Sequence, residues 1–205
     1  MSNSFPFKYS PIVEFSNNSF WKVFILVALL NLISTIIYNH LVWSDLIYLN
    51  ESGLDVSDGT FVSGSKTRLI INLIVEVLSP IWLLFKSFVF SILIYSVGYL
   101  IKLSISLIEL NKIFLVSYIF IVFGDLINSV LLLVVEQPSI KNDILHYYPL
   151  SVLGFLSSSS DFLKYYFVWS RINIFQLGFL FSIYYLFKHK FSLKNRDSII
   201  LVFTY

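Results

Sequence analysis

Cysteine is absent from this 205-residue chain. Disulfide bonds, thiolate metal sites and a cysteine nucleophile are therefore all excluded. Charge is also scarce, because charged residues make up 13% of the sequence, whereas a soluble domain carries about 25%. The net charge of +2 is too small to create the basic field that nucleic-acid binding needs. So few charged residues leave too little polar surface to cover a water-soluble globule.

Hydrophobic residues are abundant instead, at 57% of the chain, and aromatic residues make up 19%. Lipid is the solvent that suits such a composition. We therefore expect an all-α, polytopic membrane helix bundle that has the lipid bilayer as its first partner.

Long apolar runs predict four full spans, because a helix rises about 1.5 Å per residue. These spans cover residues 20–41, 81–101, 113–135 and 172–187. A fifth apolar segment, 198–205, is too short to cross, so we expect a half-inserted last helix or a chain that continues natively. Residues 1–18 are polar and contain prolines, which predicts an irregular or interfacial segment before a single transmembrane domain, 19–205. The first span lacks a cleavage site and is interpreted as an uncleaved anchor.

The positions of lysine and arginine predict the orientation, because short cytoplasmic loops carry an excess of these residues. A cytoplasmic N-terminus collects most of the basic residues on the inside and most of the acids on the outside, including those of a water-exposed loop at 44–67. The inside set is Lys8, Lys22, Lys102, Lys112, Lys188, Lys190, Lys194 and Arg196 against Glu14, Glu109 and Asp197. The outside set is Asp45, Glu51, Asp55, Asp58, Glu136, Asp143 and Asp161 against Lys66, Arg68 and Lys141.

Two segments are expected to form interfacial amphipathic helices. Arg68, Asn72 and Glu76 recur every four residues and share one stripe of a helix. A solvated or headgroup-facing stripe is the favoured interpretation, and a substrate groove is the alternative. Pro80 then predicts a kink or a new helix start. The second segment, 161–171, carries residues that anchor a chain at the membrane surface, namely Tyr165, Tyr166, Trp169 and Arg171.

Asp125 is a carboxylate in the middle of the third span. An isolated charge at the centre of a bilayer costs about 2.5–3.5 kcal/mol. Lys86 lies at a similar depth in the second span, so we predict a Lys86–Asp125 ion pair, with Asn128 and Ser129 adding hydrogen bonds one turn away. A structural role is favoured over a proton relay, ion relay or gate, because transport sites gather more than two such groups. Other polar residues, expected to bond between helices, are Asn31, Ser34 and Asn39.

Sequence motifs of enzymes are missing. "VFGD" resembles the Gly-x-Gly-Asp motif of intramembrane aspartyl proteases, but its first glycine is absent and no second aspartate lies within a span. The chain has no G-x-S-x-G, no HExxH and no P-loop. His40, His146 and His189 fall at places that cannot converge on one metal ion. We therefore expect no catalytic residue, no cofactor and no metal.

Four stretches resemble the YIP-domain (Ypt-interacting protein) family of multispanning membrane proteins, in its bacterial branch. They are "LSPIWLLFKSFVFSILIYSVGYLIK", "SYIFIVFGDLI", "NDILHYYPLSVLGFL" and "INIFQLGFLFSIYYLFK". The resemblance implies a five-helix membrane bundle with a cytoplasmic N-terminus and no known catalytic activity. Eukaryotic members are associated with Rab GTPases and vesicle traffic, and some bacterial members look like accessory subunits beside ABC-type exporters.

The leading hypothesis is a non-enzymatic accessory, scaffolding or regulatory subunit of a larger membrane complex. The suspected complex is an ABC-type efflux transporter, and the suspected partner is its permease or adaptor. The expected location is the bacterial inner membrane. The alternative is a small transporter or channel that uses Lys86, Asp125 and Glu76. An intramembrane enzyme is the remaining possibility.

Overall fold

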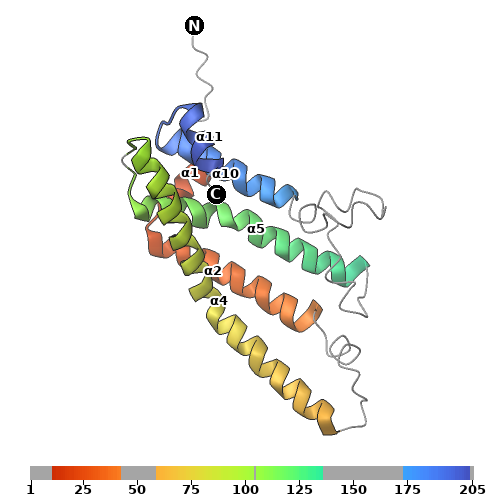
Figure 1. Cartoon of the computed structure of the whole chain (residues 1–205). Coiled ribbons are helices and arrows are strands. Elements are labelled where there is room, and N and C mark those ends of the chain that lie inside the picture. Colours follow the sequence, from red (N-terminus) through yellow and green to blue (C-terminus); the bar gives the residue numbers. More distant parts are fainter. Residues whose placement is uncertain (1–10, 43–58, 104, 136–172, 204–205) are drawn as a thin grey trace, which may run out of the picture. The chain divides into compact units, whose positions relative to one another are not determined.

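The computed structural model describes residues 11–42, 59–103, 105–135 and 173–203 (Figure 1). Its elements are helices throughout, which confirms the all-α prediction for this part of the chain. In chain order they are α1 (Pro11–Ser16), α2 (Phe20–Ile37), the π-helix η1 (Tyr38–Val42), α4 (Gly59–Leu100), α5 (Leu107–Val135), α10 (Ile174–Lys190) and α11 (Asn195–Phe203).

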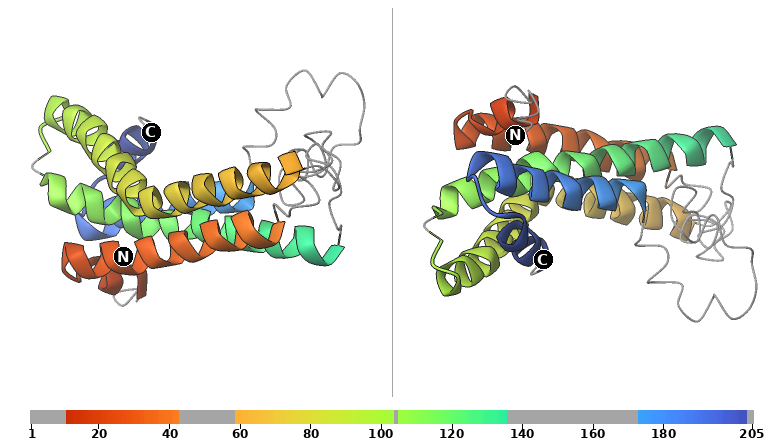
Figure 2. Two further views of the ribbon diagram at one scale, coloured as in Figure 1. Left: turned by 90° about the horizontal axis from the view of Figure 1, so that it is seen from below. Right: turned by 90° about the horizontal axis from the view of Figure 1, so that it is seen from above.

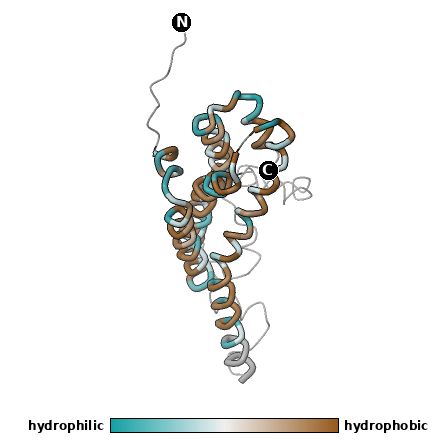
Figure 3. The backbone as a smooth tube through the Cα atoms, turned by 90° about the vertical axis from the view of Figure 1, so that its left-hand side faces the viewer, coloured by the Kyte–Doolittle hydropathy of each residue, from teal (hydrophilic) through white to brown (hydrophobic). Residues whose placement is uncertain are grey.

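Three helical stretches are long and apolar enough to cross a membrane. They are Phe20–Val42, which joins α2 to η1, Lys66–Leu100 in α4, and Leu107–Val134 in α5. Figure 3 shows these helices as predominantly hydrophobic, with hydrophilic residues at isolated positions. The helix α10 has 17 residues and α11 has nine, so the fourth and fifth spans stay predictions.

Local capping explains where several helices begin and end. Ser106 caps α5, since its hydroxyl accepts a hydrogen bond from the Glu109 amide at 3.2 Å, and Asn173 caps α10 by accepting from the Gln176 amide at 2.7 Å. Lys102, with φ at 58°, ends α4 in a Schellman arrangement, in which the Leu103 amide donates to the Gly98 carbonyl at 2.8 Å. The link between α4 and α5 is therefore shorter than the predicted 102–112.

The helix α4 corrects three predictions. It runs without a break from Gly59 to Leu100 with Pro80 inside it, so the new helix start at Pro80, the separate interfacial helix at 68–78 and the loop over 59–67 are all wrong. A proline removes one hydrogen bond from a helix, whereas a full break in an apolar setting would leave many more backbone groups unsatisfied. At the N-terminus, α1 also replaces part of the expected irregular segment, with Pro11 at its first position.

The chain divides into two compact units, and α2, α4, α5 and α10 each contribute to both. Unit 1 comprises residues 1–28, 83–119 and 178–205. Within it, α5 and α10 run antiparallel: Glu109 pairs with Lys190 at 2.6 Å, and Ser117, further along α5, donates to the earlier Ser182 of α10 at 3.1 Å. Figure 2 shows α10 beside this part of α5 in both views. The fully buried residues of unit 1 include Leu110, Ile113, Leu115, Ile183, Leu186 and Phe187.

Unit 2 comprises residues 29–82 and 120–177. Within it, α2 and α4 run antiparallel, because Asn31 bonds to Ser79 at 2.6 Å and Asn39 bonds to Glu76 at 3.2 Å. The α4 segment of unit 2 has a polar inner face and an apolar outer face. Arg68, Asn72 and Ser79 are buried, while the exposed residues around them are Leu69, Ile70, Ile71, Leu73, Ile74, Val75, Val77 and Leu78. Membrane helices commonly pack through small and polar residues, since lipid is as apolar as leucine.

Candidate functional site

One face of α2 and η1 carries a stripe of polar side chains within unit 2. Asn31, Ser34, Thr35, Tyr38 and Asn39 follow the spacing of adjacent helical turns, which places them on one face. The Thr35 hydroxyl donates to the Asn31 carbonyl at 2.9 Å, so this residue satisfies its donor within its own helix. The amide of Asn31 reaches α4 through its bond to Ser79.

A second stripe lies on α5 and has the same helical spacing. It consists of Asp125, Asn128, Ser129 and Leu132. The Ser129 hydroxyl donates to the Asp125 backbone carbonyl at 2.8 Å. Ser129 is buried, whereas the side chain of Asp125 is accessible.

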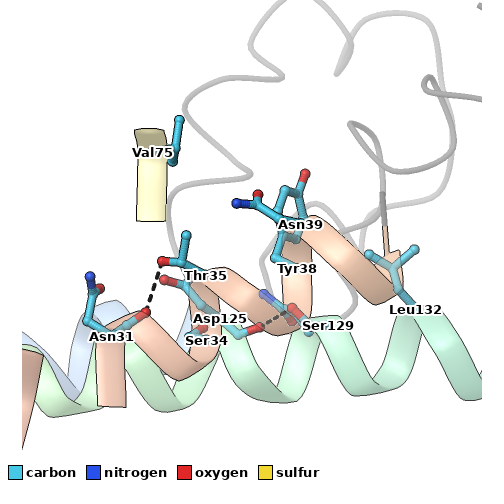
Figure 4. Close-up of a pocket in the computed structure, with 10 residues that line it drawn as sticks. Asn31, Ser34, Thr35, Tyr38, Asn39, Val75, Asp125, Ser129 and Leu132 are labelled. Carbon is cyan, nitrogen blue, oxygen red and sulfur yellow. Dashed lines mark hydrogen bonds between the residues drawn. The ribbon is translucent and has the colours of Figure 1, made fainter. Parts of the chain in front are cut away.

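The two stripes line one pocket of about 450 Å³ in unit 2. We call this the polar pocket. Nine of its ten lining side chains come from the α2–η1 and α5 stripes, and the tenth, Val75, comes from α4. Figure 4 shows Thr35 and Asp125 on facing helices, with Leu132 toward one end. The pocket therefore places a carboxyl group among amides and hydroxyls, between helices that are otherwise apolar.

The polar pocket contains one carboxyl group among amides and hydroxyls that both donate and accept hydrogen bonds. Asp125 offers carboxyl oxygens, and Asn128 contributes a buried amide oxygen that receives no hydrogen bond from any described residue. A buried acceptor without a donor costs about 1–3 kcal/mol. None of the described lining residues is a lysine, arginine or histidine.

In the predicted stripe, Arg68 and Asn72 are buried and Glu76 is half-buried, which corrects the solvated interpretation. The exposed fractions of Arg68 and Asn72 are 8% and 9%. Arg68 donates to the Asn39 carbonyl at 3.2 Å, and Glu76 accepts from Asn39 and lies 2.9 Å from the Nε2 atom of His40. Polar residues turn inward here because the opposite face of α4 is apolar and suits lipid. The alternative interpretation, in which the stripe lines a substrate groove, has no direct support. The polar pocket is lined by Val75 of α4 and by no member of the stripe.

The predicted partners Lys86 and Asp125 belong to different units. Lys86 lies in unit 1, where its ammonium group is 5.7 Å from the ring centroid of Tyr118. Asp125, Asn128 and Ser129 do come together, as predicted, and they line the polar pocket with Asn31, Ser34 and Asn39 of α2. The Lys86–Asp125 pair itself stays a prediction.

A charged cluster in unit 1 joins three helices. Glu109 on α5 pairs with Lys112 at 2.5 Å and with Lys190 of α10 at 2.6 Å. Lys190 also donates to the Ser16 carbonyl at the end of α1, at 2.8 Å, and Lys112 reaches the Asn18 carbonyl at 3.5 Å. Lysine at a helix C-terminus satisfies free carbonyl groups and complements the helix dipole. This cluster connects α1, α5 and α10 within unit 1, and we interpret it as a structural feature.

Sequence reasoning missed two features of these helices. Thr35 and Tyr38 line the polar pocket, and the signal that could have revealed them was their spacing from Asn31. Gly124 was given no packing role from the sequence, yet a Cβ atom there would lie 2.7 Å from the Phe175 ring. This contact marks close packing of α5 and α10 within unit 2.

Other predicted site residues are not placed. Tyr165, Tyr166, Trp169 and Arg171 lie outside the described residues. Within the described ranges, no three histidine, aspartate or glutamate side chains gather closely enough to hold a metal ion.

No protein-family model, curated protein or solved structure matches this chain. Its assignment therefore depends on its own sequence and structure: the described residues form helices, and three of these are long and apolar enough to cross a membrane.

Proposed function

We propose that this chain is a non-enzymatic integral membrane protein that serves as an accessory, scaffolding or regulatory subunit of a larger complex. One observation carries the proposal: in the most apolar windows of the three long helices, only 22%, 33% and 39% of residues are buried. Lipid and the spans of a partner protein are the two surfaces that suit the uncovered remainder. An ABC-type efflux transporter of the bacterial inner membrane is the candidate complex, and the resemblance to the YIP-domain family is its motivation.

The proposed orientation places the N-terminus in the cytoplasm. It is supported by the charged cluster of unit 1, because Lys112 and Lys190 come from two predicted cytoplasmic segments and share Glu109 as a partner. Introduced cysteines provide the test, since the native chain has none. We expect a membrane-impermeant maleimide, added to intact cells, to label a Ser57→Cys variant and to leave a Lys194→Cys variant unlabelled. The reverse pattern would overturn the orientation.

Cross-linking tests the partner. Leu73 and Val77, on the outer face of α4, are 62% and 63% exposed, whereas Ser91 is fully buried. We expect Leu73→Cys or Val77→Cys to cross-link in native membranes to one recurring membrane protein, which also co-purifies in mild detergent. Ser91→Cys is the matched control and should give no adduct. Recovery of this chain alone, at native expression, with cross-links to itself or to none, would contradict an accessory role.

A small transporter or channel is the second candidate, and the polar pocket around Asp125 favours it. Transport sites within membranes gather polar and ionisable groups that face a cavity. In proteoliposomes, a proton or cation flux that Asp125→Asn abolishes and Asp197→Asn preserves would support this candidate. Asp197 lies on α11 in unit 1 and does not line the pocket, whose residues belong to unit 2. Absence of flux, or flux unchanged by Asp125→Asn, would exclude it.

A further inference from the structure

Unit 1 carries exposed basic side chains that its own acids do not neutralise. In the charged cluster, Glu109 already pairs with Lys112 and Lys190. Other basic side chains of unit 1 are exposed and form no hydrogen bond or ion pair with any described residue. They are Lys22, Lys102, Lys194 and Arg196.

These four cations lie at one end of unit 1, which we call the basic end. The charged cluster brings the chain between α1 and α2 to the start of α5 and the end of α10, through the contacts of Lys112 and Lys190. Each cation is within seven residues, along the chain, of a residue that takes part in these contacts, and one residue spans at most about 3.6 Å. Figure 2 shows the start of α2, the end of α4 and the start of α5 toward the same side in both views.

Exposed aromatic side chains accompany two of these cations. Trp21 precedes Lys22, and Tyr99 lies three residues before Lys102. Both aromatic side chains are exposed. Tryptophan and tyrosine are enriched where the hydrocarbon of a bilayer meets the headgroups, and a lysine side chain near a helix end extends its ammonium group to that level. The aromatic neighbours therefore indicate that Lys22 and Lys102 lie at the depth of lipid phosphate groups.

The helix α11 combines a cation with apolar surface on its exposed side. Ser198 and Leu201 are buried, whereas Arg196, Ile199 and Phe203 are exposed. The three exposed residues are spaced three and four apart, so they share one face of the helix. A helix whose exposed face is both basic and apolar suits the membrane surface, where anionic lipids add electrostatic attraction.

We propose that the basic end of unit 1 binds the phosphate groups of anionic phospholipids through Lys22, Lys102, Lys194 and Arg196. The exposed apolar side chains beside these cations favour a lipid over a water-soluble anion as the occupant. The proposal goes beyond the proposed function, since it needs helices in a bilayer and no partner protein. A missing lipid preference together with a recurring cross-linked partner would overturn this proposal and leave the accessory role standing.

Fluorescence quenching by brominated phospholipids tests the proposal, because Trp21 lies at the basic end. The substitutions Trp43→Phe, Trp82→Phe and Trp169→Phe leave it as the only tryptophan. In vesicles that mix phosphatidylcholine with phosphatidylglycerol, we expect the anionic lipid to be preferred at Trp21 by about fivefold or more. Salt at about 1 M should abolish the preference. Equal quenching by the brominated forms of the two lipids at low salt would overturn the proposal.

Charge variants distinguish this surface from general attraction to a basic protein. Lys102→Gln and Arg196→Gln should each lower the preference by up to about fivefold. Lys66→Gln is the matched control, because it removes an exposed lysine of unit 2, and it should leave the preference at Trp21 unchanged. Equal losses in all three variants would overturn the proposal.

A second measurement uses the native chain with all of its tryptophans. A ligand that binds only the folded state raises the unfolding temperature. In uncharged detergent micelles, phosphatidylglycerol should raise it, whereas phosphatidylcholine and glycerol 3-phosphate should leave it unchanged. An equal rise with glycerol 3-phosphate would identify a soluble phosphate ligand instead of a lipid. That result, or no rise with phosphatidylglycerol, would overturn the proposal.

Discussion

Replacing Gly124 with alanine tests the packing of α5 against α10 within unit 2. Gly124 is buried, and an added Cβ atom would lie 2.7 Å, 2.8 Å and 2.9 Å from three carbon atoms of Phe175. Carbon atoms at optimal separation are about 3.5–4.0 Å apart. One of the three atoms is the Cβ of Phe175, so rotation of the ring alone cannot relieve the clash. The helices must separate or the backbone must shift.

Two opposing effects determine how much Gly124→Ala changes the free energy of unfolding. Overpacking of this kind costs about 1–3 kcal/mol, and alanine recovers about 0.5–1 kcal/mol relative to glycine within a helix. We therefore expect Gly124→Ala to lower the free energy of unfolding by about 1 kcal/mol, or up to about 2 kcal/mol.

Gly98 on α4 provides the matched control, because it is also a buried glycine in a helix. A Cβ atom there would meet only the Leu103 Cβ, at 4.0 Å, among the atoms around it. Gly98→Ala should therefore be neutral or stabilising by up to about 1 kcal/mol. The assay is unfolding of the purified chain by sodium dodecyl sulfate in mild detergent micelles, followed by tryptophan fluorescence.

A double-mutant cycle isolates the contact itself. If Phe175 is the obstacle, Gly124→Ala should cost much less in a Phe175→Ala background, with a coupling energy of about 1 kcal/mol. The reasoning would be refuted by equal effects of alanine at positions 124 and 98, or by zero coupling between Gly124 and Phe175.

Three further substitutions test local features. Lys102→Gly should stabilise the chain by about 1 kcal/mol, because glycine adopts the positive φ of 58° without steric cost; a loss of stability in the same unfolding assay would contradict this. Glu109→Gln should destabilise unit 1 by about 1–3 kcal/mol, since its two lysine partners lose their counter-charge, whereas Glu14→Gln, at an exposed position, should have little effect. Asn173→Ala should cost about 1 kcal/mol through loss of the α10 cap, and circular dichroism should report a lower helix content; an unchanged spectrum and stability would argue against the cap.

The polar residues on each helix could be predicted from spacing, and their packing partners could not. Spacing along a helix places Asn31 and Ser34 on one face of α2, and Asp125 and Ser129 on one face of α5. Nothing in either pattern says that these two faces line one pocket. The pairing of Asp125 with Lys86 was inferred from their opposite charges and similar depth in neighbouring spans, and it stays a prediction.

The stripe on α4 was misinterpreted for a related reason. In a soluble protein, a polar stripe on an apolar helix faces solvent. In lipid the preference is reversed: Arg68 and Asn72 are buried, whereas Leu73 and Val77 are exposed. The same preference lets α4 continue through Pro80, because an apolar environment penalises further unpaired backbone groups.

Composition and local signals determined much about this protein. The scarcity of charge and the long apolar runs identify helices that suit lipid, and residue spacing identifies the polar faces of α2 and α5. Only the tertiary structure decided that the α2 and α5 stripes enclose a pocket, that Gly124 admits Phe175, and that Glu109 joins α1, α5 and α10. The physical reason is that propensity and periodicity act along one helix, whereas the rotation of each helix against its neighbours depends on side chains far apart in sequence. In lipid the apolar pattern does not choose that rotation, because hydrocarbon and a protein core are equally apolar.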